Sequence, residues 1–170
     1  MPAHQWEQTI EEEREDTMRG RFITFAVGRE TYAIEIRYVT EIVGIQPINN
    51  LPETPDHIKG VINLRGKIIP VVDMRLKFKK EPMEYNDRTC IIVVDIQGDE
   101  QATRMGVIVD AVSEVLNVRE EDIEPAPSFG DRARTEYILG MANMDERVKL
   151  LLDIDKVFDP EEIADLEKAA

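Results

Sequence analysis

Apolar residues in this chain fall in short runs that are rich in β-branched side chains and end at glycine, asparagine or charged residues. The clearest example is the stretch Ile58–Leu76, IKGVINLRGKIIPVVDMRL. Within it, Gly60–Leu64 and Lys67–Val72 are strand-like runs joined across Arg65-Gly66, and this pattern predicts a β-hairpin. A guanidinium at the tip of an apolar hairpin is either solvated or held for a partner.

The same pattern continues on both sides of this stretch. RFITFAVG and ETYAIEI predict a second hairpin that turns at Gly28-Arg29-Glu30. Further strand-like runs lie at residues 38–45, 89–96, 105–118, 137–144 and 148–158, with loop and short turn over residues 119–136.

Two short helices are predicted from capping signals. Thr54 as a cap, Pro55 at the first helical position and Gly60 as the closing residue predict a single helical turn before the central hairpin. A helix over residues 159–170 is predicted with Asp159 as its N-cap and Pro160 at its first position. Glu162 would complete a capping box, and Phe158 would pack against Ile163.

Three blocks of sequence occur twice in the same order. Residues 33–42, AIEIRYVTEI, match residues 106–115, GVIVDAVSEV. Ile58-x-Gly60-x-x-Asn63 matches Ile138-x-Gly140-x-x-Asn143, Asp73 matches Asp153, and FITFAVG resembles CIIVVDI. The repeat is too long for a solenoid, so it indicates two copies of a small all-β unit. With about five short strands each, the copies are expected to remove their sheet edges by closing into barrels.

The predicted cores are drawn separately from Phe22–Val72 and Ile91–Leu152. The matched blocks do not share one offset, which leaves room for a strand that crosses between the two units. The copies differ at the hairpin tip, where NLRGKIIPVVD in the first becomes NMDERVKLLLD in the second. The fold therefore does not require Arg65 at that tip, and this points to a functional role for Arg65.

Composition narrows the class of protein. The chain has 170 residues and a net charge of −14, and a negative field disfavours nucleic acid and anionic membrane surfaces as partners. Cys90, the single cysteine, sits in the apolar run CIIVV and is expected to be a buried, unreactive thiol. No apolar stretch is long enough for a membrane helix, so a cytoplasmic protein is expected. Residues 1–19 form an acidic arm that is expected to be flexible.

Catalytic and metal-binding patterns are absent from the sequence. His4 and His57 have no spaced second ligand, so no metal or other cofactor is predicted. Four aspartates end apolar runs and are expected to cap turns or helices rather than to act as acids or bases, namely Asp73, Asp95, Asp110 and Asp153. We therefore predict a protein that is not an enzyme.

The stretch TPDHIKGVINLRGKIIPVVDMRLKF resembles the signature of CheW-type chemotaxis coupling proteins. The resemblance runs over Arg21–Phe158 and includes EYND, the VDAVSEV block and the segment Pro125–Pro127 in family order. It implies an all-β fold of two packed SH3-like five-stranded barrels with short connecting helices, at approximately residues 20–80 and 85–158. Similar barrels form the regulatory domain of the chemotaxis histidine kinase CheA.

The resemblance implies an adaptor that links the cytoplasmic tips of methyl-accepting chemoreceptors to CheA, and so is recruited to membrane-associated receptor arrays. An alternative is a regulatory domain separated from a larger signalling protein, either the kinase or a coupling–receiver fusion. The implied receptor-binding residues are Val39, Glu41 and Arg65, and the implied kinase-side or structural residues are Gly60, Cys90 and Gly106.

The residues also allow plainer interpretations. Val39 suits a core position, and Glu41 suits an exposed charge at a strand edge. Gly60 would close the helical turn at positive φ, and Arg65 would be a solvated turn residue.

Overall fold

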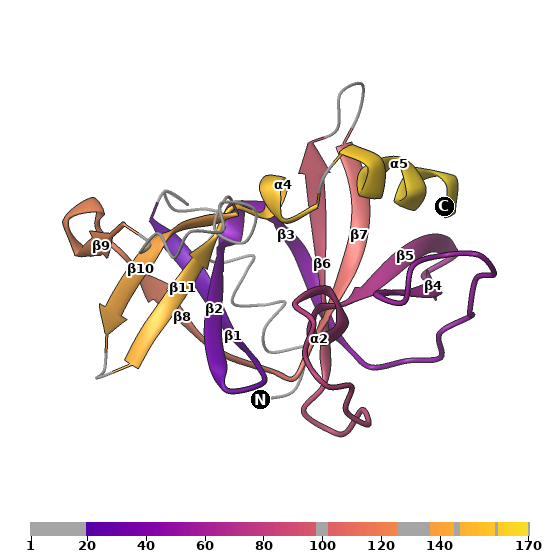
Figure 1. Cartoon of the computed structure of the whole chain (residues 1–170), viewed down its shortest axis with the longest axis horizontal. Helices are drawn as coiled ribbons and strands as arrows, with labels where there is room; N and C mark the ends of the chain where they lie inside the picture. Colours follow the sequence, from indigo (N-terminus) through magenta and orange to yellow (C-terminus); the bar gives the residue numbers. More distant parts are fainter. Residues whose placement is uncertain (1–19, 98–101, 126–136, 145–146, 159, 170) are drawn as a thin grey trace.

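The computed structural model describes residues 20–97, 102–125, 137–144, 147–158 and 160–169 (Figure 1). The expectation of a flexible arm at residues 1–19 lies outside this part of the chain. The structure is dominated by strands, which confirms the predicted all-β class. Its elements are β1 (Arg21–Val27), β2 (Glu30–Glu35), η1 (Ile36–Tyr38), β3 (Val39–Gly44), β4 (Ile58–Leu64), β5 (Lys67–Asp73), α2 (Met74–Lys77), β6 (Cys90–Gln97), β7 (Ala102–Val109), β8 (Ala111–Asn117), η2 (Glu120–Asp122), β9 (Ile123–Glu124), β10 (Ile138–Met144), β11 (Arg147–Leu152), α4 (Ile154–Val157) and α5 (Pro160–Ala169).

The strands form two sheets, and each sheet takes one hairpin from the other half of the chain (Figure 1). The six-stranded sheet has the order β8-β1-β2-β11-β10-β9, and the five-stranded sheet has the order β3-β6-β7-β5-β4. The sheets therefore do not coincide with the contiguous ranges 20–80 and 85–158, for which the sequence had allowed an exchange of strands. The strand crossing that the repeat suggested is present, and it involves the whole hairpins β1–β2 and β6–β7.

Strand pairing confirms the duplication at the level of single residues. In β4–β5 a bulge separates the pairs Ile58↔Val72 and Gly60↔Val71, and β10–β11 has the same bulge between Ile138↔Leu152 and Gly140↔Leu151. The parallel pairing also repeats. Val71 of β5 pairs with Gly106 of β7, and at the equivalent positions of the other sheet Leu151 of β11 pairs with Ala33 of β2. The sheets are thus two copies of one arrangement.

In each sheet, the far hairpin also pairs with the segment that follows the first strand. Asn49, which follows β3, bridges to Val61 of β4, and β9, which follows β8, pairs with β10. This pattern supports closure of both sheets, although full closure into two five-stranded barrels stays a prediction.

Apolar side chains gather in three clusters. One lies within the five-stranded sheet and includes Ile62, Ile91 and Val93, and another lies within the six-stranded sheet and includes Phe22 and Leu151. The third and largest contains side chains from both sheets, among them the alternate residues of β6. Since β6 is buried on both faces, its sequence is a continuous apolar run, which is typical of a strand covered on each side.

The predicted helical turn at Thr54–Gly60 is wrong. The segment forms turns in which the Ile58 amide donates to the Pro55 carbonyl at 3.0 Å, and β4 already begins at Ile58. Gly60 does have a positive φ of 146°, as expected, but for a different reason. It lies at the bulge of β4, where a Cβ would be 2.0 Å from the Asn49 carbonyl oxygen.

The predicted C-terminal helix is present as α5, although its expected N-cap Asp159 lies outside the described residues. Phe158 belongs to the large cluster, and Ile163 packs against that cluster. Glu162 accepts hydrogen bonds from Lys77 Nζ at 2.6 Å through both of its carboxylate oxygens. The carboxylate predicted for a capping box thus ties α5 to the segment that follows β5.

Candidate functional site

The tip of the β4–β5 hairpin is built for an exposed arginine. Arg65 and Gly66 both have positive φ, 52° and 84°, as a two-residue type I′ turn requires. Asn63 Oδ1 accepts a hydrogen bond from the Gly66 amide at 2.8 Å and so stabilises this turn. The Arg65 side chain is 69% exposed. A non-glycine residue in the left-handed region is uncommon, so the backbone accepts some strain to present a guanidinium here.

Arg65 forms an ion pair with Glu41 of β3, the residue also expected to bind the receptor. The Glu41 side chain is only 14% exposed, so it is not the solvated strand-edge charge of the plainer interpretation. Glu41 pairs with Val93 of β6, which places its side chain on the inner face of the five-stranded sheet, at one end. The pair therefore joins the tip of one hairpin to a neighbouring strand.

A second ion pair lies near the first. Arg104 of β7 donates to both carboxylate oxygens of Asp95 of β6, at 2.9 and 3.3 Å. The hydrogen bond to Asp95 raises the pKa of Arg104, and the charge of Glu41 adds to the effect. Two arginines and two carboxylates thus gather at one end of this sheet. We call Glu41, Arg65, Asp95 and Arg104 the charged end.

An exposed apolar residue lies on the hairpin that carries Arg65. Ile68 is 59% exposed and lies on β5 opposite Asn63, on the outer face of the same hairpin. Sequence reasoning missed Ile68, Asp95 and Arg104 as site residues. Ile68 could have been predicted to be exposed, because neighbouring residues of a strand face opposite sides and Ile69 faces the inner cluster. Nothing in the sequence placed Asp95 and Arg104 beside Glu41, since that depends on the pairing of β3 with β6 and of β6 with β7.

Val39 does not join this surface. Its side chain is fully buried in the large cluster, where it pairs with Val94 of β6. The structure thus brings together Glu41 and Arg65, whereas Val39 supports the strand that carries Glu41.

The residues suggested for the kinase side are buried as well. A Cβ on Gly106 would be 2.6 Å from a methyl group of Ile91, so glycine is needed there for strand packing, as it is at Gly60. Burial raises the pKa of the Cys90 thiol, which donates to the Arg88 carbonyl at 3.3 Å. Cys90 is therefore buried, as the sequence predicted. Each of these residues has a packing role, and none offers a side chain to a partner.

The strand-end aspartates have structural roles. Asp73 accepts hydrogen bonds from the Arg75 amide at 2.9 Å and the Tyr85 hydroxyl at 2.8 Å, and Asp153 accepts one from the Asp155 amide at 3.1 Å. Both cap the helices that follow, as predicted. Asp110 instead accepts two hydrogen bonds from the Arg75 guanidinium and one from the Gly28 amide, all at 2.8 Å. This bidentate pair holds the β1–β2 turn against α2.

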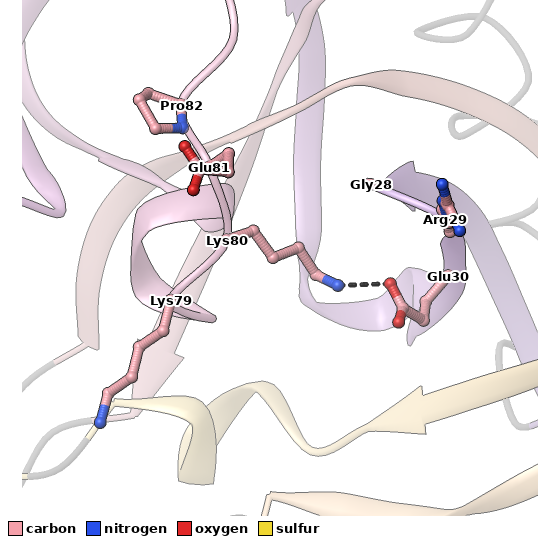
Figure 2. A pocket seen from close by; sticks show the side chains of 7 residues that line it. All are labelled: Gly28, Arg29, Glu30, Lys79, Lys80, Glu81 and Pro82. Carbon is pink, nitrogen blue, oxygen red and sulfur yellow. Dashed lines mark hydrogen bonds and ion pairs between the residues drawn. The ribbon is translucent and has the colours of Figure 1, made fainter.

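The β1–β2 turn lies beside an open pocket lined by Gly28, Arg29, Glu30, Lys79, Lys80, Glu81 and Pro82 (Figure 2). Lys80 points across it and pairs with Glu30, and this hydrogen bond lowers the pKa of Glu30. The pocket is shallow and carries no arrangement of nucleophile, base and orienting group. Within the described ranges, no cluster of three or more histidine, cysteine or acidic side chains has a geometry that would hold a metal ion. In the same part of the chain, no helix is long and apolar enough to cross a membrane.

Comparisons with known proteins identify relatives of this chain. Residues 21–162 match the CheW-like domain. The chain is 39% identical to the chemotaxis protein CheW of Klebsiella aerogenes over 91% of each chain, and 34% identical to that of Rhizobium meliloti over 82% of this chain and 88% of the relative. The crystal structure of the scaffolding protein TtCheW from Thermoanaerobacter tengcongensis is similar, with a TM-score of 0.72 and 35% identity over 85% of this chain and 90% of that one. The chain therefore belongs to the CheW-like family.

Proposed function

We propose that this protein is a chemotaxis coupling adaptor without enzymatic activity, which links the cytoplasmic tips of chemoreceptors to the histidine kinase CheA. The observation that carries the proposal is the charged end on a CheW-like fold. There, an arginine that the fold does not require is presented at a hairpin tip and oriented by Glu41. We further propose that the protein acts in the cytoplasm and reaches membrane-associated receptor arrays through these partners.

The charged end suits a receptor helix. A guanidinium presents its donors in a planar fork that matches carboxylates and backbone carbonyls, and Ile68 adds an apolar contact on the same hairpin. An interface of standard size buries roughly 1,200–2,000 Å² and depends on a few central side chains. In this proposal Arg65 and Glu41 contact the receptor, while Val39 acts by keeping β3 in place.

The kinase requires a different surface, because one patch cannot hold two partners at once. We do not place the kinase contact on Gly60, Cys90 or Gly106, since all three residues are buried and the two glycines have no side chain to offer. Substitutions there would weaken kinase binding through the fold. The relatives that the chain resembles at 39% and 34% identity are named chemotaxis protein CheW, which favours the adaptor over the regulatory domain of a larger signalling protein.

The test is to measure binding of this chain to a receptor cytoplasmic-tip fragment and to the CheA regulatory domain, first separately and then together. An adaptor binds both, and the first partner leaves the affinity for the second unchanged or improved. Competition between the two partners would contradict the two-surface proposal. Failure to bind either partner would contradict the adaptor function itself.

A further inference from the structure

A second surface with partner-binding chemistry lies at the β1–β2 turn, on the other sheet from the charged end. Two shallow pockets meet there and share Arg29 and Glu30. The first is the pocket of Figure 2, and the second is lined by Thr31 and by residues of β11. We call the surface formed by Arg29, Lys79, Lys80, Arg147, Val148 and Leu150 the basic groove.

The basic groove has the opposite charge to the rest of the molecule. Its two pockets contain four basic side chains and two acidic ones, Glu30 and Glu81, in a chain whose net charge is −14. Glu30 is already paired with Lys80. Among the residues that the structure describes, no acidic side chain pairs with Arg29 or Arg147. Two guanidinium groups are therefore available to an anionic partner.

The floor of the groove is apolar. Val148 is 50% exposed, and exposed large hydrophobic side chains are few in the described part of the chain, the others being Ile68 and Leu139. Leu150 is partly buried and continues from Val148 toward the large cluster between the sheets. An apolar floor between arginines fits a segment that carries both carboxylates and apolar side chains.

We propose that the chain's own N-terminal arm, residues 1–19, docks in the basic groove. The arm lies outside the described residues, and its sequence MPAHQWEQTIEEEREDTMR carries six carboxylates and two arginines. Trp6 and Ile10 are its large apolar residues, and most of its carboxylates follow in EEERED. The apolar residues meet Val148 and Leu150, and the carboxylates meet Arg29, Arg147 and Lys79.

The length of the arm permits this docking. β1 has seven residues, so Arg21 lies roughly 20 Å from the end of β1 beside the groove, at about 3.3 Å per residue. Ile10 precedes Arg21 by 11 positions, and an extended chain of that length reaches roughly 36 Å. A tether of this length gives the arm an effective concentration on the order of millimolar, which compensates for the weakness of exposed ion pairs. The docked arm competes with any acidic, apolar segment of another protein.

Trp6 allows a direct test, because it is the single tryptophan of the chain. In the full chain at low salt, we expect a blue-shifted tryptophan emission and protection from acrylamide quenching. Arg147→Glu should lower the docking equilibrium constant about fivefold, as expected for the loss of an exposed ion pair and its replacement by repulsion. Arg29→Glu should act alike, and raising the salt to about 1 M should also release the arm by screening.

Two matched controls separate docking from general effects. Arg119→Glu makes the same charge change at an arginine whose side chain is 75% exposed and which lies outside the groove, and it should leave the Trp6 signal unchanged. Val148→Ala should release Trp6, whereas Ile68→Ala, at the equivalent position of the other hairpin, should not. A solvent-exposed Trp6 in the parent chain would overturn the proposal. So would a protected Trp6 that ignores all three groove substitutions, or a blue shift that depends on protein concentration, which would indicate docking between copies.

Discussion

Replacing Arg65 with glutamate tests whether the hairpin tip acts in binding or in folding. The Arg65 side chain is 69% exposed and that of its partner Glu41 is 14% exposed, so water around Arg65 weakens the attraction between the two charges. Ion pairs with an exposed partner contribute about 1 kcal/mol or less to stability. The new carboxylate would repel Glu41, but it can turn outward into water. The positive φ of 52° disfavours arginine and glutamate alike, so its cost cancels.

We therefore expect Arg65→Glu to lower the free energy of unfolding by about 1 kcal/mol, which is roughly 2–4 °C in Tm for a chain of this length. The same change should weaken binding to a receptor-tip fragment by about 2 kcal/mol, or roughly 30-fold in Kd. The assay measures the denaturation midpoint and the receptor affinity on one sample. Lys67→Glu is the matched control, since it makes the same charge change two positions along, and it should lose much less affinity.

A charge swap, Glu41→Lys with Arg65→Glu, then separates the two roles. It should restore stability by forming the ion pair again, and it should leave receptor binding weak, because the guanidinium is absent. If the swap restored receptor affinity, Arg65 would act only through its pair with Glu41. If Arg65→Glu unfolded the protein, or bound receptor as well as the parent, Arg65 would be a plain turn residue.

Three further predictions follow from the geometry. In a urea titration, Gly60→Ala should lower the free energy of unfolding by about 3 kcal/mol or more, because its Cβ would lie 2.0 Å from a carbonyl oxygen. Gly66→Ala, whose Cβ would have no atom within 4 Å, should lower it by about 1 kcal/mol, and equal losses would refute this reasoning. Asp110→Asn removes the partner of a bidentate arginine whose side chain is 18% exposed, and should cost about 2 kcal/mol in the same assay; a loss below about 0.5 kcal/mol would contradict the proposed clamp. Because Lys80 lowers the pKa of folded Glu30, this pair stabilises the protein above the usual glutamate pKa and loses its effect as the pH falls through the lowered value. Lys80→Met should therefore reduce the loss of unfolding free energy at acid pH. An unchanged dependence of the unfolding free energy on pH would refute this role of the pair.

Much of the local structure follows from the sequence. The two-residue turn at Arg65-Gly66 was predictable because a glycine between two β-branched runs indicates a tight hairpin. The duplication was predictable because the glycines at the two bulges, Gly60 and Gly140, and the caps Asp73 and Asp153 serve the same local needs in each copy. These features depend on residues close together in the sequence.

The partners of each strand could not be predicted in the same way. Alternation shows which residues of a strand face a core, but the apolar runs of β1 and β6 suit either sheet equally well. The exchange of hairpins is decided by packing between sheets, where alternate residues of both strands enter the large cluster. The burial of Val39 follows from this exchange, because its pairing partner Val94 comes from the other half of the chain. The wrong helical turn before Ile58 arose because Thr54 and Pro55 favour a β-turn as well as a helix start.

The exchanged hairpins also determine how mutants of this protein must be interpreted. Each sheet contains strands from both halves of the chain, and one apolar cluster joins the two sheets, so neither half holds a complete core. A substitution at Cys90 disturbs that shared core, and one at Gly106 disturbs the core of the five-stranded sheet, so either would weaken receptor and kinase binding together. A substitution at the exposed tip, such as Arg65, leaves the core intact and would affect one partner. Loss of both partners therefore indicates a folding defect, and only variants that lose one partner locate a binding surface.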